Sequence, residues 1–184
     1  MTEVVGTRFA LYDEAGLSTV IARMARQLDA LVDGDRPLLL GMLRRGAPLA
    51  DRLVGALEAR RPLAIERLDL LVKRYSDDLR LLHPETRLDV PSDSAEKIGG
   101  RQVFVVDDVL YQGYSLFRVI EYLRAAGAAS IHAVVLADRC VARLPVQADV
   151  VGVRLQIAPG DVVECCVPPY EAKFGIEVLR PNID

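Results

Sequence analysis

One stretch of this chain constrains its fold more than any other: VFVVDDVLYQGYS, residues 103–115. It begins with an unbroken apolar run, which is typical of a strand buried on both faces of a parallel sheet. Two adjacent carboxylates, Asp107 and Asp108, follow directly, and Gly113 then precedes an amphipathic segment at 115–127. The stretch therefore predicts a buried strand at 101–110, a glycine turn and a helix that ends at Gly127.

Helical and strand periods alternate through most of the remaining chain. Strands are expected at 37–43, 62–75 and 130–139, and a helix at 18–32 with Ser18 as its N-cap and Gly34 as its stop. Pro48 suits the first turn of a second helix that runs to about Arg60. Such alternation favours an α/β fold with a mostly parallel twisted sheet and helices on both faces.

The C-terminal part continues with shorter elements. Short strands are expected near 149–154 and 161–167, and the tail beyond them can add an edge strand. The polar segment 76–99 contains Pro84 and Pro91 and breaks the alternation. A connection of this length is usually functional or disordered, so it is interpreted as a mobile loop over the site or as a β-hairpin arm.

Composition limits the classes of function. The 184 residues, 51% of them hydrophobic, fit one domain over 1–184, and a net charge of -3 argues against a cationic nucleic-acid binder. No apolar run reaches the roughly 18 residues of a membrane span, and the start does not resemble a signal peptide. The odd set Cys140, Cys165 and Cys166 has no CxxC spacing, so reduced thiols in a cytoplasmic protein are expected.

Three polar features follow predicted strands: Arg44-Arg45-Gly46, Asp107-Asp108 and Asp138-Arg139. Ligands of parallel sheets bind beyond the carboxyl ends of the strands, so these features are expected to lie near one site. His132, inside a predicted strand, is interpreted as structural rather than as a ligand.

The stretch 107–115 has the composition of a site for a phosphorylated ribose. Gly113 permits a turn whose N–H groups, next to a helix N-terminus, form a nest for a monophosphate. Ser115 can cap the helix or donate its hydroxyl to the phosphate. Asp107 and Asp108 precede the nest and can accept hydrogen bonds from vicinal hydroxyls or help to hold magnesium. The alternative is a plain strand end followed by a plain turn.

These residues resemble the phosphoribosyl pyrophosphate (PRPP) motif of type I phosphoribosyltransferases, in particular the PyrR type, which joins pyrimidine-operon regulation to uracil phosphoribosyltransferase activity. That motif reads V-D-D-V-L-Y-T-G-R-T, and this chain has V-D-D-V-L-Y-Q-G-Y-S. The resemblance covers roughly 18–155. Further matches are Arg45-Gly46, Tyr75-Ser76-Asp77-Asp78-Leu79, Asp138-Arg139, Leu144-Pro145, Ala148-Asp149 and Val151-Gly152.

The resemblance implies a site for PRPP. The nest at 112–115 would hold the 5′-phosphate, and Asp107 and Asp108 would bind the ribose hydroxyls, assist a proton transfer and contribute to a magnesium site. Arg45 and the backbone around it would bind pyrophosphate, in a loop that often contains a cis peptide. The implied PRPP-binding residues are Arg44, Arg45, Gly46, Asp107, Asp108, Val109, Leu110, Tyr111, Gln112, Gly113, Tyr114 and Ser115.

The resemblance also assigns the surroundings of this site. The segment 76–99, with Arg74, Tyr75 and Arg80, would be the mobile loop, and 140–184 a hood and C-terminal appendage. A homodimer or higher oligomer would be common for the family. The nucleobase would lie near Asp138, Arg139, Val151 and Gly152.

Three departures from the pattern leave alternatives open. Gln112 stands in place of a threonine, Tyr114 in place of an arginine, and Ser76 in place of the loop arginine. The leading hypothesis is a magnesium-dependent phosphoribosyltransferase that uses PRPP and a nucleobase, with uracil favoured. The alternatives are a non-catalytic PRPP or nucleotide sensor and an RNA-binding regulator of pyrimidine genes. A metal-dependent phosphatase is disfavoured because the first strand does not end in an aspartate.

Overall fold

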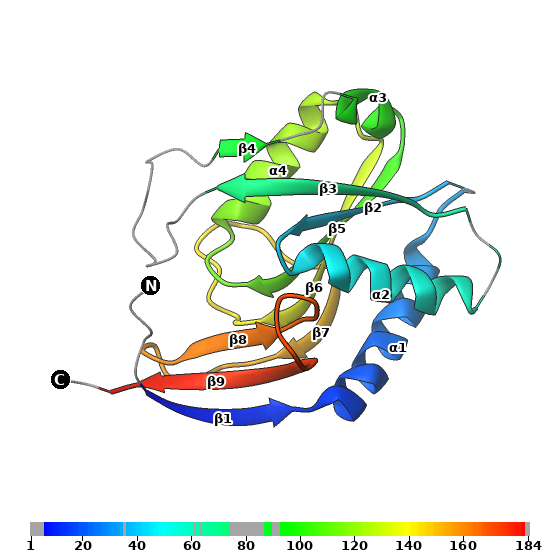
Figure 1. The fold of residues 1–184 in the computed structure, drawn as a ribbon. Coiled ribbons are helices and arrows are strands. Elements are labelled where there is room, and N and C mark those ends of the chain that lie inside the picture. The colour runs from blue at the N-terminus through cyan, green and yellow to red at the C-terminus, as the bar shows by residue number, and fades with distance from the viewer. Residues whose placement is uncertain are drawn as a thin grey trace.

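A computed structural model describes residues 6–34, 36–60, 62, 64–73, 87–89 and 93–182. The strands form two sheets: six strands in the order β4-β3-β2-β5-β6-β7 and three in the order β1-β9-β8. Figure 1 shows the three-stranded sheet as a separate layer below the larger one. We call this smaller layer the hood sheet.

The large sheet is parallel except for its edge strand β4. β5 lies between β2 and β6, and its residues 103–106 are completely buried. This confirms the prediction for the apolar run. The strands are β2 (Leu38–Leu43), β3 (Glu66–Lys73), β4 (Arg87–Asp89), β5 (Gln102–Leu110), β6 (Ser130–Asp138) and β7 (Val150–Arg154).

Helices cover both faces of this sheet, as predicted. On one face α1 and α2 share an apolar core with the hood sheet, and on the other α3 and α4 pack in a second core. Figure 1 shows α4 on the side opposite α1 and α2. The bounds are α1 (Glu14–Leu31), α2 (Gly46–Glu58), α3 (Ser94–Ile98) and α4 (Tyr114–Ala125).

The start of α1 differs from the prediction. The N-cap is Asp13, whose side chain accepts a hydrogen bond from the Gly16 backbone N–H at 2.8 Å. Ser18 lies inside the helix, and its hydroxyl donates to the Glu14 carbonyl at 2.8 Å. The helix therefore begins at Glu14, earlier than predicted, because an aspartate N-cap is as favourable as a serine N-cap.

The hood sheet takes strands from both ends of the chain. It consists of β1 (Gly6–Tyr12), β8 (Val162–Cys166) and β9 (Gly175–Pro181). The prediction of an edge strand in the tail is wrong in position, because β9 is the central strand and pairs antiparallel with both β1 and β8. β7 belongs to the large sheet.

The segment 76–99 contains regular structure near its end. β4 pairs antiparallel with β3, and α3 follows it. Of the two alternatives for this segment, the antiparallel pairing of β3 with β4 agrees with the β-hairpin arm, and α3 shows that its last part is helical. Arg74, Tyr75 and Arg80, predicted for the mobile loop, lie outside the described residues. No helix in the part of the chain that the structure describes is long and apolar enough to cross a membrane.

Candidate active site

Asp107 and Asp108 lie where the central strand extends beyond its neighbour. Pairing of β2 with β5 ends at Gly41 and Val106, whereas pairing of β5 with β6 continues to Leu110 and Asp138. The chain leaves β2 into the Arg44-Arg45-Gly46 loop at this level. The end of β5 with Asp107 and Asp108 therefore lies at the carboxyl edge of the sheet, next to this loop, the place where parallel sheets bind ligands.

The two carboxylates are partly buried and repel each other. Burial raises the pKa of Asp107 well above its usual range, and the charge of Asp108 raises it further. Burial also raises the pKa of Asp108, although the Arg45 charge acts in the opposite direction. Only 20% of the Asp108 side chain is exposed, although the residue stands near the end of a strand. A site of this kind favours a cation or a hydroxyl donor close by.

Asp107→Asn should make stability less sensitive to pH. The raised pKa of Asp107 means that the folded state holds a proton which the unfolded state loses at pH values above about 3.8. Stability should thus fall as pH rises from there towards the folded-state pKa. The variant should lose less stability over this interval. The difference in free energy of unfolding between the variant and the unsubstituted protein, measured in urea, should therefore shift in favour of the variant as pH rises. An advantage that shrinks with rising pH would contradict the assignment.

The turn after β5 requires a glycine. Gly113 has φ 87° and is the N-cap of α4, and a Cβ added to it would lie 2.5 Å from Val146 Cγ2. Gln112 accepts a hydrogen bond at 3.0 Å from the Arg143 backbone N–H through its own backbone carbonyl, which attaches the 140–148 segment to the turn. Ser115 lies in the first turn of α4 and not at its cap. The N–H groups of this helix start form an anion-binding arrangement.

The remaining residues of the stretch differ in their surroundings. The side chains of Val109 and Leu110 pack against the two apolar cores, so only their backbone can reach a ligand. Tyr111 is 48% exposed. Tyr114 is partly buried in the first turn of α4.

The loop after β2 brings a cation to the aspartates. Its Leu43–Arg44 peptide bond is cis, and Arg45 is the N-cap of α2. Arg45 Nη1 lies 3.9 Å from Asp108 Oδ2, and the Arg45 guanidinium also binds Glu171 of the hood. Gly46 packs directly on the Val106 carbonyl, leaving no room for a Cβ.

Arg139 is a buried cation between β6 and the hood. It is 5% exposed, its Nη1 donates to the Asp161 carbonyl at 3.3 Å, and its guanidinium lies 5.4 Å from the Tyr111 ring centroid. Its Nε has no hydrogen-bond partner among the described residues. A buried donor without a partner is costly, which favours a ligand acceptor at this place.

A cavity of about 390 Å³ adjoins Asp138 at the same edge of the sheet. Its lining includes Leu110, Cys140 and Arg154. The Asp138 carboxylate accepts a hydrogen bond from the Cys140 backbone N–H at 2.8 Å, so this carboxylate shapes the turn after β6. The cavity is large enough for a small aromatic ring system.

Val151 and Gly152 lie apart from this edge. They stand in β7 before Arg154, the residue that pairs with Asp138. The Gly152 carbonyl accepts a hydrogen bond from Arg23, and a Cβ on Gly152 would meet the Leu136 carbonyl and Met24 Sδ. These contacts describe packing between β6, β7 and α1, and the base-binding prediction for both residues stays a prediction.

Two hood residues near the site have no counterpart in the sequence predictions. Glu171 binds Arg45, and the backbone of Asp161 binds Arg139. Both follow residue 155, where the family pattern ends, and neither has a local motif. Glu171 lies 126 residues from Arg45 in the sequence, and Asp161 lies 22 residues from Arg139. Local periodicity therefore does not reveal either contact.

The opposite end of the sheet holds a different cleft. A cavity of about 560 Å³ is lined by residues that include Arg36, Glu66 and Arg101. Glu66 forms ion pairs with both arginines, at 2.8 and 2.6 Å, so these charges compensate one another. The compensated charges of this cleft do not call for a ligand, whereas the carboxylate pair and the buried donor without a partner favour the carboxyl edge as the site.

Comparison with known families decides the identity. A family model described as the phosphoribosyl transferase domain matches residues 10–172. This chain belongs to the phosphoribosyltransferase family. The Bifunctional protein PyrR of Corynebacterium glutamicum is 32% identical to this phosphoribosyltransferase, over 99% of this chain and 97% of the relative. A Bifunctional protein PyrR of Listeria monocytogenes serotype 4b is 34% identical over 92% of this chain and 95% of the relative.

Solved structures support the fold of the enzyme. A hypoxanthine phosphoribosyltransferase of Trypanosoma cruzi superimposes with a TM-score of 0.76 and 21% identity, covering 98% of this chain and 95% of that chain. One from Staphylococcus aureus gives a TM-score of 0.67 with 20% identity, covering 82% of this chain and 79% of that chain. The predicted type I phosphoribosyltransferase fold is therefore confirmed.

Proposed function

We propose that this phosphoribosyltransferase transfers ribose 5-phosphate from PRPP to a nucleobase, with uracil favoured, and releases pyrophosphate. The observation that carries the proposal is the meeting, at one edge of the sheet, of the α4 N-terminus, the Asp107-Asp108 pair and Arg45. These three features match the three charged or polar parts of PRPP. The resemblance of the VDDVLY motif to the PyrR type supports uracil as the base.

The 5′-phosphate would bind at the start of α4. Backbone N–H groups after Gly113 point out of the helix start, where the helix dipole also favours an anion. Gln112 can donate through its amide and Ser115 through its hydroxyl. These two donors replace the hydroxyl of the threonine that the family motif has at the position of Gln112.

The ribose would lie over the carboxylate pair. Asp107 and Asp108 can accept hydrogen bonds from its vicinal hydroxyls, which relieves the repulsion between two partly buried charges. The raised pKa of Asp107 suits it to exchange a proton with the base or the leaving group. Most of the rate enhancement in such a site comes from positioning and charge stabilisation.

The same pair fits magnesium. Mg²⁺ is usually held by one or two carboxylates together with substrate oxygens. Among the described residues no group of three His, Cys, Asp or Glu side chains is arranged to hold a metal. Asp107 and Asp108 would thus hold the ion with the help of PRPP itself, and the bound ion would supply positive charge at the pyrophosphate.

The leaving group and the base would occupy opposite sides of the ribose. Arg45 and the Arg44-Arg45-Gly46 backbone would bind pyrophosphate, and Arg139 would supply its unpaired Nε–H to a carbonyl oxygen of the base. A donor at that point favours an oxo group such as those of uracil over an exocyclic amine. The part of the 76–99 segment that precedes β4 would exclude water during transfer.

Turnover with a panel of bases tests the proposal. The protein is mixed with PRPP, magnesium and uracil, hypoxanthine, guanine, adenine or cytosine, and pyrophosphate release is measured. We expect release with uracil above the others and no release with adenine or cytosine. PRPP binding without pyrophosphate release for any base would favour a nucleotide sensor, which the substitutions Gln112 and Tyr114 support.

Assembly and location belong to the same proposal. A homodimer in the cytoplasm fits the family resemblance, and the solved T. cruzi relative is described in terms of its oligomeric state. Binding of pyrimidine-operon leader RNA is a second activity, implied by the resemblance of the sequence motifs to the PyrR type. A net charge of -3 and the missing arginine at 114 weigh against it.

A further inference from the structure

The hood places a carboxylate on Arg45, the residue proposed for pyrophosphate. Arg45 Nε and Nη2 both donate to Glu171 Oε1, at 2.9 and 2.5 Å. The second oxygen, Glu171 Oε2, accepts a hydrogen bond from the Val167 backbone N–H at 2.7 Å. Glu171 is therefore fixed at both oxygens and occupies the side of the guanidinium formed by Nε and one terminal nitrogen.

This arrangement puts one guanidinium between two carboxylates. Arg45 Nη1 is 3.9 Å from Asp108 Oδ2, whereas Nε and Nη2 bind Glu171. The hydrogen bond to Glu171 raises the pKa of Arg45. Burial raises the pKa of Glu171, but the hydrogen bonds and charges that oppose it, led by the hydrogen bond from Arg45, make the net shift downward. Both partners are therefore charged at neutral pH.

We infer that Glu171 competes with pyrophosphate for Arg45 and so sets the affinity of the enzyme for PRPP. The inference rests on the proposed role of Arg45 in pyrophosphate binding. The edge of the guanidinium that Glu171 occupies is an edge that binds two oxygens of a phosphate side by side. A pyrophosphate placed there beside Glu171 and Asp108 would be repelled by both. Binding therefore exchanges the carboxylate on Arg45 for a phosphate oxygen.

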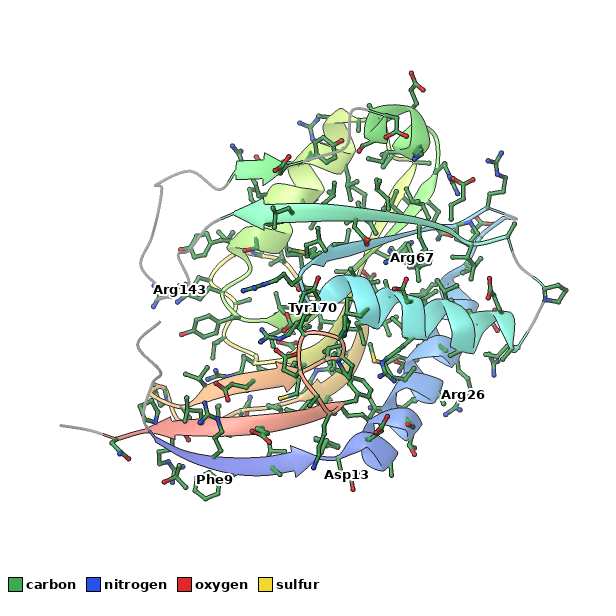
Figure 2. All side chains as sticks on the ribbon, in the orientation of Figure 1. Phe9, Asp13, Arg26, Arg67, Arg143 and Tyr170 are labelled. Atoms are coloured by element: carbon green, nitrogen blue, oxygen red, sulfur yellow. The ribbon has the colours of Figure 1, made fainter. Side chains whose placement is uncertain are left out.

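The exchange requires Glu171 to leave Arg45 and to give up the hydrogen bond from the Val167 backbone N–H. Glu171 lies between β8 and β9, and its neighbour Tyr170 is 45% exposed. Figure 2 labels Tyr170 on the loop that joins β8 and β9. The far end of the segment is anchored by buried Phe174, whose ring centroid lies 4.2 Å from the Arg52 guanidinium. Release of Arg45 thus leaves the hood core intact.

Glu171→Gln tests the inference through the binding of inorganic pyrophosphate. The substitution keeps the shape of the side chain and removes its charge, so pyrophosphate should bind about two- to fivefold more tightly, the range of a partly exposed ion pair. The matched control is Glu164→Gln, since Glu164 also pairs with an arginine, Arg8, at 3.0 Å on the hood. Calorimetric titration with pyrophosphate and magnesium should give the control the affinity of the unsubstituted protein. The KM for PRPP should fall in parallel with the pyrophosphate Kd.

The outcomes separate this inference from the proposed function. If the unsubstituted protein binds neither pyrophosphate nor PRPP, both are overturned. If it binds them and Glu171→Gln binds them equally or more weakly, only the competition is overturned, and Glu171 instead positions Arg45. Glu171→Asp gives a second measurement should the glutamine variant fail to fold. The shorter side chain keeps its charge but no longer extends to the Arg45 guanidinium. It should also bind pyrophosphate more tightly.

Discussion

The double replacement Asp107→Asn with Asp108→Asn should lower turnover with PRPP by about 10³-fold or more, the scale of a lost proton-transfer group or charge-stabilising group. Asparagine keeps the size of each side chain and the acceptor oxygen that binds the next backbone N–H, at 2.9 Å for Asp107 and 3.0 Å for Asp108. It removes the two negative charges proposed to bind the ribose and magnesium. The fold should therefore persist while the chemistry is lost.

Stability of the double variant provides an internal check. Two partly buried carboxylates with raised pKa values destabilise the folded state at neutral pH, so their removal should leave the melting temperature unchanged or higher. Glu121→Gln is a suitable control, because Glu121 pairs with Arg118 at 3.1 Å on the exposed side of α4. Pyrophosphate release by the control should equal that of the unsubstituted protein. Equal release by the double variant would place the active site elsewhere.

The sequence predicts the centre of this site well because its signals are local. The apolar run before Asp107 indicates burial on both faces, and the structure buries residues 103–106 completely. A glycine between a strand and an amphipathic segment indicates a turn, and Gly113 has the positive φ that a side chain resists. Strand, turn and helix each need only a few neighbouring residues to be recognised.

The hood shows where local signals end. β1 has almost no buried residues, so it lacks the alternation that identifies a strand, and its partner β9 lies at the other end of the chain. The Arg45–Glu171 pair joins residues 126 positions apart and depends on that same long-range packing. The pairing of the two chain ends, and the carboxylate that it brings to Arg45, can therefore be seen only in the tertiary structure.

Gly46→Ala should affect stability and activity together. Gly46 begins α2 and packs on β5 immediately before the aspartates, where an added Cβ would collide with the Val106 carbonyl and come 3.2 Å from Asp107 Cα. Both are backbone atoms, which cannot turn aside as a side chain can. The loop carrying Arg45 must therefore move away from the strand carrying Asp107 and Asp108. Overpacking of this kind costs about 1–3 kcal/mol, and a shift near 1 Å can cost about 10²-fold in rate.

Gly55→Ala separates the steric effect from the general effect of adding a methyl group to α2. Nothing lies within 4 Å of a Cβ at Gly55, and the residue is in the interior of the same helix. That variant should gain about 0.5–1 kcal/mol, because alanine favours helix over glycine, and should keep its turnover. Urea unfolding and PRPP turnover measured on both variants should show opposite changes in stability and a loss of turnover in Gly46→Ala alone. If Gly46→Ala retains full turnover, the close contact between the Arg45 loop and β5 does not position the site.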